Sequence, residues 1–95
     1  MFIIELTYKV PIEKIEEQLA AHVSYLDKYY ASGNFIASGR KVPRDGGFIL
    51  AKAPDKNAVE SIISEDPFYI HALSDYRIIE IIATRKIESL TALQD

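Results

Sequence analysis

The sequence contains no cysteine, and glycine and proline occur only four times each. Without cysteine the chain has no disulfide bonds, no thiolate nucleophile and no cysteine metal site. Few glycines and prolines, with 48% hydrophobic and 26% charged residues, do not match the composition of a disordered chain. A length of 95 residues therefore predicts one globular domain.

Long hydrophobic runs are also lacking. Apolar stretches span only a few residues, which excludes a membrane-spanning helix, and the start MFIIELTYK has neither the basic region nor the cleavage site of a signal peptide. We therefore expect a cytoplasmic protein without a membrane partner. Eleven basic and 14 acidic residues give a net charge of −3, which argues against a broad surface for nucleic acid. A small-molecule ligand is the better expectation.

Hydrophobic periodicity indicates the first elements. Residues 2–9 alternate with the two-residue period of a strand. Pro11 suits a first helical position and Gly33 suits the residue after a helix end, so we predict one helix over Pro11–Ser32. We expect His22 on its apolar face, which the spacing of amphipathic helices traces through Ile12, Ile15, Leu19, Val23, Leu26 and Tyr30.

A hairpin, a helix and a last strand follow. Residues 35–37 and 48–51 are predicted strands, separated by the turn composition of RKVPRDGG. Asp55 can cap a helix that must end near Asp66, because Pro67 pushes the preceding residue into an extended conformation. The isoleucine-rich segment 76–84 reads as the last strand. The order βαββαβ predicts an α+β, ferredoxin-like domain over residues 1–85 with a four-stranded antiparallel sheet.

The first and last strands carry apolar side chains on both faces of this sheet, including Ile3 and Ile79. Two helices cover only one face, and burying an exposed aliphatic side chain is worth about 1.5–3 kcal/mol. We therefore expect a homodimer, or a higher oligomer, in which the sheets face each other. The tail, residues 86–95, could form a short helix that contacts another subunit through Ile87 and Leu90. A frayed terminus is the alternative.

His22 and Asp66 are the candidate catalytic residues. A histidine in the middle of a helix among apolar side chains is partly desolvated, which favours the neutral imidazole that acts as a base. A carboxylate held extended before Pro67 could orient one ring nitrogen and leave the other free to move a proton. The alternatives are a core histidine bonded to the backbone and an ordinary Asp-Pro turn.

The end of the second strand and the hairpin supply candidate binding residues. Ser38 and Gly39 could offer a hydroxyl and a backbone amide to a substrate, although a glycine there also suits a bulge. Arg40, with Lys41 and Arg44, could attract an anionic ligand. The alternative is a charged hairpin that is simply solvated.

Two further residues near the second helix are candidates for substrate binding. Phe68 follows the Asp-Pro pair, and His71 could approach the same site or face solvent. No metal is expected, because His22 has no histidine or carboxylate three or four residues away. The sequence contains no cofactor-binding motif, so no cofactor is expected either.

Several short motifs occur together in a specific order: His22 within AHVSYLDKYYASGNF, Ser38-Gly39, GGFIL, and Asp66-Pro67-Phe68 followed by YRIIEI. In this order the chain resembles the YciI-like (YCII-related) family of the dimeric α+β barrel group. The resemblance implies a dimer with a pocket in which His22 and Asp66 form an acid–base pair and Ser38 occupies the strand end. Many members carry Arg-Pro ahead of the histidine, where this chain has Ala20-Ala21.

The leading functional hypothesis is a small-molecule enzyme. Its His22–Asp66 pair would perform elimination, isomerisation or related lyase chemistry. The alternative is a non-catalytic ligand-binding or regulatory dimerisation module, and a third is a purely structural association domain. The enzyme hypothesis requires the two side chains to meet beside an accessible cavity.

Overall fold

Four strands form a single antiparallel sheet in the order β2-β3-β1-β4. The computed structural model describes residues 1–93. This strand order, with helices in the two crossovers, is the ferredoxin-like α+β arrangement and confirms the predicted fold class. The strands are β1 (Phe2–Tyr8), β2 (Phe35–Arg40), β3 (Gly46–Ala51) and β4 (Ser74–Glu80).

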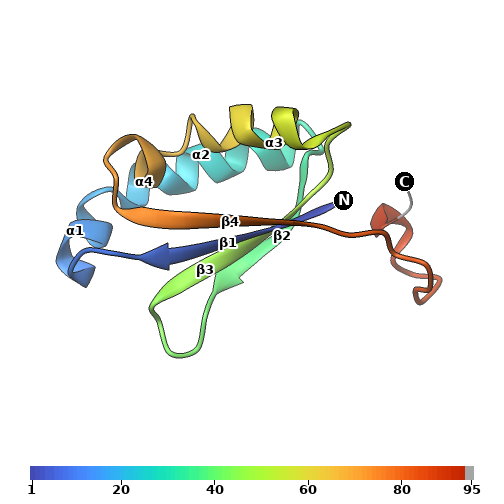
Figure 1. The fold of residues 1–95 in the computed structure, drawn as a ribbon, viewed down its shortest axis with the longest axis horizontal. Coiled ribbons are helices and arrows are strands. Elements are labelled where there is room, and N and C mark those ends of the chain that lie inside the picture. The colour runs from blue at the N-terminus through green and yellow to red at the C-terminus, as the bar shows by residue number, and fades with distance from the viewer. Residues whose placement is uncertain (94–95) are drawn as a thin grey trace.

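The helices lie on one side of the sheet, and no element of residues 1–93 covers its other face (Figure 1). A helix α1 at the end of β1 leads into the longer α2, and α3 and α4 complete the helical layer (Figure 1). The bounds are α1 (Ile12–Glu17), α2 (Leu19–Ala31), α3 (Lys56–Ile63), α4 (Pro67–Ile70) and a 3-10 turn η1 (Thr91–Leu93).

The core lies between the sheet and the helices. The alternation predicted for the first strand is confirmed, since Phe2, Ile4 and Leu6 of β1 are buried on the helix-covered face. Ile4 pairs in register with Ile49 of β3, which therefore lies on the same face. The helices contribute the buried residues Ile15, Tyr25, Tyr29, Val59, Ile62, Ile63 and Phe68.

The prediction of one helix over Pro11–Ser32 was wrong, because the chain bends at Gln18. There the backbone takes φ −107° and ψ 5°, which ends α1 and begins α2. The bend changes which side of the second helix faces the core, so its buried side chains are His22, Tyr25 and Tyr29. The predicted apolar face is wrong for Leu19 and Val23, which are 38% and 45% exposed.

The second half differs from the prediction mainly at Pro67. Asp55 caps α3 as expected, its Oδ1 accepting from the Ala58 N–H at 2.8 Å. Asp66 is extended as expected, but Pro67 also begins the short helix α4, which the sequence reading missed. The last strand ends at Glu80 rather than residue 84.

The tail beyond β4 projects away from the sheet (Figure 1). Within it the expected short helix is limited to the single turn η1, and Ile87 and Leu90 are exposed. The last two residues of the predicted tail, 94–95, lie outside the described residues. In the part of the chain that the structure describes, no helix has the length and apolar character needed to cross a membrane.

Candidate active site

Asp66 is fully buried, yet both of its carboxylate oxygens are paired. Oδ1 contacts His22 Nδ1 at 2.7 Å and accepts from the Phe68 N–H at 3.0 Å, as a cap of α4. Oδ2 accepts from the Tyr76 hydroxyl at 2.6 Å. An ionised carboxylate can only accept hydrogen bonds. The groups around Asp66 can all donate hydrogen bonds, so they suit its ionised form.

Two tyrosines near Asp66 keep their protons. Burial, followed by the negative charge of Asp66, raises the pKa of Tyr76 far above its ordinary value of 10. The same two causes, in the same order, raise the pKa of Tyr25, whose hydroxyl donates to the Ile62 carbonyl at 3.0 Å. Tyr76 is therefore a permanent donor to Asp66.

His22 comes from the middle of α2 and is mostly buried. Its ring stacks on the Phe68 ring, with centroids 4.0 Å apart and planes 4° from parallel. Nδ1 is taken by Asp66, whereas Nε2 has no hydrogen-bond partner among residues 1–93. Ser74 Oγ is the only fully buried, unpaired side-chain N or O atom there, so Nε2 keeps solvent contact.

A cavity of about 430 Å³ opens beside this ring, between α2 and strands β2 and β3. Leu19, Val23 and Leu26 of α2 form one apolar wall, and Leu6 of β1 and Ile49 of β3 form another. The stripe that periodicity assigned to the core thus lines a hollow that a ligand can enter. A mostly apolar cavity with a few polar groups is typical of small-molecule sites.

Ser38, Gly39 and Phe68, three of the predicted binding residues, line the cavity. The Ser38 hydroxyl lies 2.7 Å from that of Tyr30, a contact that the sequence reading missed. Gly39 also leaves room for the ring of its pairing partner Phe48, because a Cβ there would lie 2.9 Å from a ring carbon of that residue.

Of the two alternatives for His71, the structure agrees with exposure to solvent and not with an approach to the same site. His71 ends α4, with its N–H donating to the Pro67 carbonyl at 3.0 Å, and it is exposed and outside the cavity lining. The short helix α4, unseen in the sequence, turns Phe68 inward and carries His71 away from the cavity.

The three basic residues of the hairpin separate. Arg40 and Arg44 line the cavity, whereas Lys41 contacts Glu5 at 3.2 Å and Thr7 at 3.0 Å. Glu5 and Thr7 lie on the face of β1 opposite the buried residues, so Lys41 is turned to the open face of the sheet. Only part of the predicted cluster is therefore available to a ligand.

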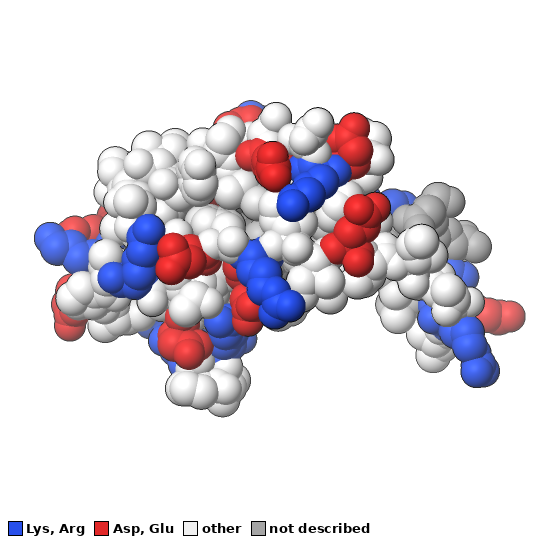
Figure 2. Space-filling view, in the orientation of Figure 1, with Lys and Arg blue, Asp and Glu red and all other residues white. Residues whose placement is uncertain are grey.

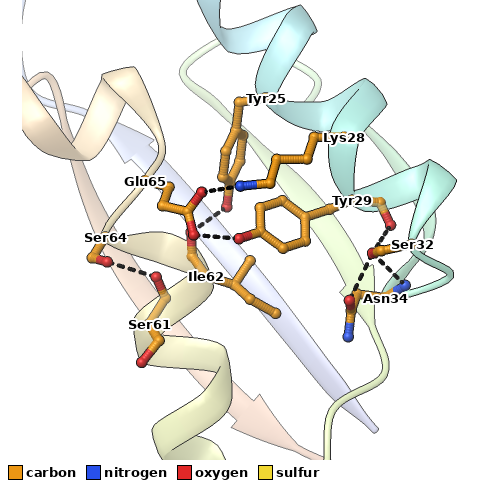
Figure 3. Close-up of polar contacts among 9 residues, drawn as sticks. All are labelled: Tyr25, Lys28, Tyr29, Ser32, Asn34, Ser61, Ile62, Ser64 and Glu65. Atoms are coloured by element: carbon orange, nitrogen blue, oxygen red, sulfur yellow. Dashed lines mark hydrogen bonds and ion pairs between the residues drawn. The ribbon is translucent and has the colours of Figure 1, made fainter.

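A separate polar network ties α2 to the residue before Asp66 (Figure 3). Lys28 and Tyr29 of α2 each donate to a different oxygen of Glu65 at 2.5 Å. The hydrogen bond from Lys28, then that from Tyr29, holds the pKa of Glu65 below its ordinary range. Together with the bond from Tyr25 to Ile62, these contacts fix the segment from which Asp66 reaches His22.

Elsewhere within residues 1–93 we find no second group of side chains comparable to the His22–Asp66 pair beside a cavity. No group of three or more His, Cys, Asp or Glu side chains there could hold a metal ion. A second hollow, of about 660 Å³, is lined by Glu80 and Ser32 but by no histidine. On the face drawn in Figure 2, side chains of both signs are interspersed and no large area carries one sign.

The structure is similar to that of 5-chloro-2-hydroxyhydroquinone dehydrochlorinase from Burkholderia phenoliruptrix AC1100, solved in complex with 2,5-dihydroxybenzoquinone. The TM-score is 0.72 at 19% sequence identity, and the match covers 85% of this chain and 93% of the other. At this identity the likeness supports the fold.

No curated protein sequence matches the chain. The family model of the YCII-related domain matches residues 1–82, which includes all four strands and both His22 and Asp66. The chain therefore belongs to the YCII-related domain family, as its motifs indicated.

Proposed function

We propose that this protein is a small-molecule enzyme in which His22 moves a proton to and from a substrate held in the cavity. One observation carries the proposal: the imidazole has one nitrogen fixed on a buried carboxylate and the other free beside the cavity. A buried carboxylate needs paired donors whatever the role of the histidine, so the feature that points to catalysis is the free Nε2 beside the cavity rather than the pairing itself.

The geometry selects the tautomer of the ring. Asp66 accepts the proton on Nδ1, so in the neutral ring the lone pair lies on Nε2, where a substrate can reach it. When Nε2 takes up a proton, the carboxylate stabilises the resulting imidazolium. Such a positioned base contributes about 10²- to 10⁴-fold in rate.

The reaction class we propose is proton abstraction followed by elimination or isomerisation. Nε2 takes a proton from a carbon or hydroxyl of the substrate, and the electron pair of the broken bond forms a double bond to that atom. In an elimination, the leaving group departs with its bonding pair from the carbon at the other end of that double bond or of the conjugated system that it joins. In an isomerisation, the pair of an existing adjacent double bond shifts to another carbon, where His22 returns the proton. Ser38 lines the same cavity and can hydrogen-bond a substrate oxygen.

The dehydrochlorinase of similar fold supplies the first test compound. Purified protein would be incubated with 5-chloro-2-hydroxyhydroquinone, and with a panel of small phenols, lactones and hydroxy acids, while chloride release and product formation are followed. Turnover that falls about 10²-fold or more in His22→Ala and in Asp66→Asn supports the proposal.

Glu65→Gln is the matched control, because it removes the charge of the neighbouring carboxylate but keeps a side chain of the same length whose amide oxygen can still accept from Lys28 or Tyr29 and hold the segment in place. Its turnover should stay near that of the unmodified protein. Equal turnover in His22→Ala would overturn the proposal. Binding of panel compounds without any conversion would favour the ligand-binding module instead.

We further propose that a second copy of the chain covers the open face of the sheet. Ile3 pairs with Leu50 and with Ile79 in register, which places three aliphatic side chains together on that face. Size-exclusion chromatography with light scattering should show a dimer at micromolar concentration, and Leu50→Lys should shift it to a monomer. Ile70→Lys, at an exposed position of α4, is the control that should leave the dimer unchanged.

A further inference from the structure

We propose that the ligand of this cavity is a small organic anion, a carboxylate or phenolate on an apolar body, whose charge is bound by Arg40 and Arg44. This inference rests on the proposed function, because it names the substrate class of the same site. The proposal starts from the charge of the cavity lining: apart from His22, the only acidic or basic side chains that line the cavity within residues 1–93 are these two arginines. The chain as a whole is acidic, with a net charge of −3, so this local excess of positive charge is not general.

The strand register puts Arg40 on the cavity side. Arg40 is the last residue of β2 and pairs with Gly47, which in turn pairs with Leu6 of β1. Paired residues of antiparallel strands lie on the same face, and Leu6 is buried beneath the helices. The guanidinium therefore starts from the helix-covered face, where the cavity lies.

The floor beside Arg40 consists of backbone. Gly47 carries no side chain, and a Cβ at this position would lie 2.7 Å from the Gly39 carbonyl oxygen. A side chain cannot be added there without moving the strand. The glycine therefore lets the backbones of β2 and β3 approach closely beside Arg40.

Arg44 reaches the same cavity from the turn between β2 and β3. Its nearest carboxylate is Glu16 of α1, at 3.6 Å from Nη1, and both side chains are partly exposed. Such an exposed pair is weak, so Arg44 can exchange Glu16 for a ligand anion. A guanidinium offers several donors in a plane and suits the two oxygens of a carboxylate.

The rest of the lining specifies the body of the ligand. The ring of Phe68 and the aliphatic wall of α2 favour a flat or apolar group. A volume of about 430 Å³ has room for a single substituted ring. The anionic group would lie toward the hairpin and the apolar body toward the ring of His22.

The test compares an anion with its neutral counterpart. Benzoate and benzamide have nearly the same shape, and their binding would be measured by isothermal titration calorimetry at constant ionic strength. Benzoate should bind about tenfold more tightly or better, because hydrogen bonds to charged groups are the stronger kind. Arg40→Gln should remove most of that preference, and Arg40→Gln with Arg44→Gln should remove it entirely.

Lys41→Gln is the matched control, since it removes one positive charge from the adjacent residue, which faces the other side of the sheet. This variant should keep the preference for benzoate. Equal binding of benzamide and benzoate, or an equal loss in Lys41→Gln and Arg40→Gln, would overturn the inference.

The same titration separates this inference from the proposed function. His22→Ala should still bind benzoate through the arginines, whatever its effect on turnover. Binding that depends on Arg40 in a protein that converts no compound would uphold the anion site and reject the enzyme. Turnover of neutral compounds that Arg40→Gln leaves unchanged would uphold the enzyme and reject the anion site.

Discussion

Two neighbouring carboxylates, Glu65 and Asp66, are held by the same kinds of side chain but in different surroundings. Asp66 is fully buried and contacts His22 and Tyr76. The Glu65 side chain is 47% exposed and contacts Lys28 and Tyr29. Each carboxylate therefore pairs with one basic residue of α2 and with one tyrosine.

Because Asp66 is buried and Glu65 is partly exposed, the contact of Asp66 with His22 and the contact of Glu65 with Lys28 have different roles. A lysine has donors but no acceptor, so Lys28 can only hold Glu65 in place. A histidine can donate through one nitrogen and accept through the other. Asp66 contacts Nδ1 of His22 and so leaves Nε2 free to accept a proton. Solvent weakens the exposed contact, and exclusion of solvent strengthens the buried one. Glu65 thus fastens the helices, and Asp66 sets up an acid–base group.

The largest expected effect comes from removing the buried carboxylate. Asp66→Ala leaves His22 Nδ1 and the Tyr76 hydroxyl without their partner, and breaking a buried pair in this way costs about 3–5 kcal/mol of unfolding free energy. Glu65→Ala leaves its partners free to bond water, so its loss should be much smaller. Urea unfolding of both variants measures the difference. Similar losses would mean that burial does not distinguish the two carboxylates.

Removing the hydroxyl of Tyr76 or of Tyr29 compares a single hydrogen bond to each of the two carboxylates. Tyr76→Phe removes a donor from a buried carboxylate, and a hydrogen bond to a charged group is worth about 1.5–3 kcal/mol. Tyr29→Phe removes the equivalent donor from Glu65, which keeps Lys28 and solvent as partners. The second loss should be the smaller one. If Tyr29→Phe proved as costly as Tyr76→Phe, the polar network of Figure 3 would count for more than its exposure indicates.

Much of this arrangement could be predicted from local sequence rules. The two-residue alternation of β1 and the cap at Asp55 depend on neighbouring residues alone, and both are confirmed. The extended backbone of Asp66 follows from the steric effect of Pro67. These rules left open whether His22 and Asp66 meet, and it was the resemblance to the YCII-related family that implied their pairing.

What the sequence did not reveal depends on tertiary context. Pro67 was interpreted only as the end of one helix, whereas it also begins the next, which turns Phe68 inward and His71 outward. Hydrophobic periodicity does not distinguish a wall of the core from a wall of a ligand cavity, so Leu19 and Val23 were assigned to the core. The contact of Tyr76 with Asp66 requires the register of β4, which no local pattern contains.

The smallest expected effect is the pH dependence of the exposed contact. The hydrogen bond from Lys28 lowers the pKa of Glu65 in the folded protein below its ordinary value of 4.5. A lowered pKa means that the unfolded chain binds a proton more readily, so the contact stabilises the fold above about pH 4.5 and loses its effect as pH falls through the folded pKa. The advantage of the unmodified protein over Glu65→Gln in urea should therefore shrink below pH 4.5, and added salt should reduce it at neutral pH. Because both proteins retain Asp66 and His22, the difference between their curves reports Glu65 alone. A difference that stayed constant with pH would show that the ion pair contributes nothing, because ionisation of Glu65 would then have no effect on the free energy of unfolding.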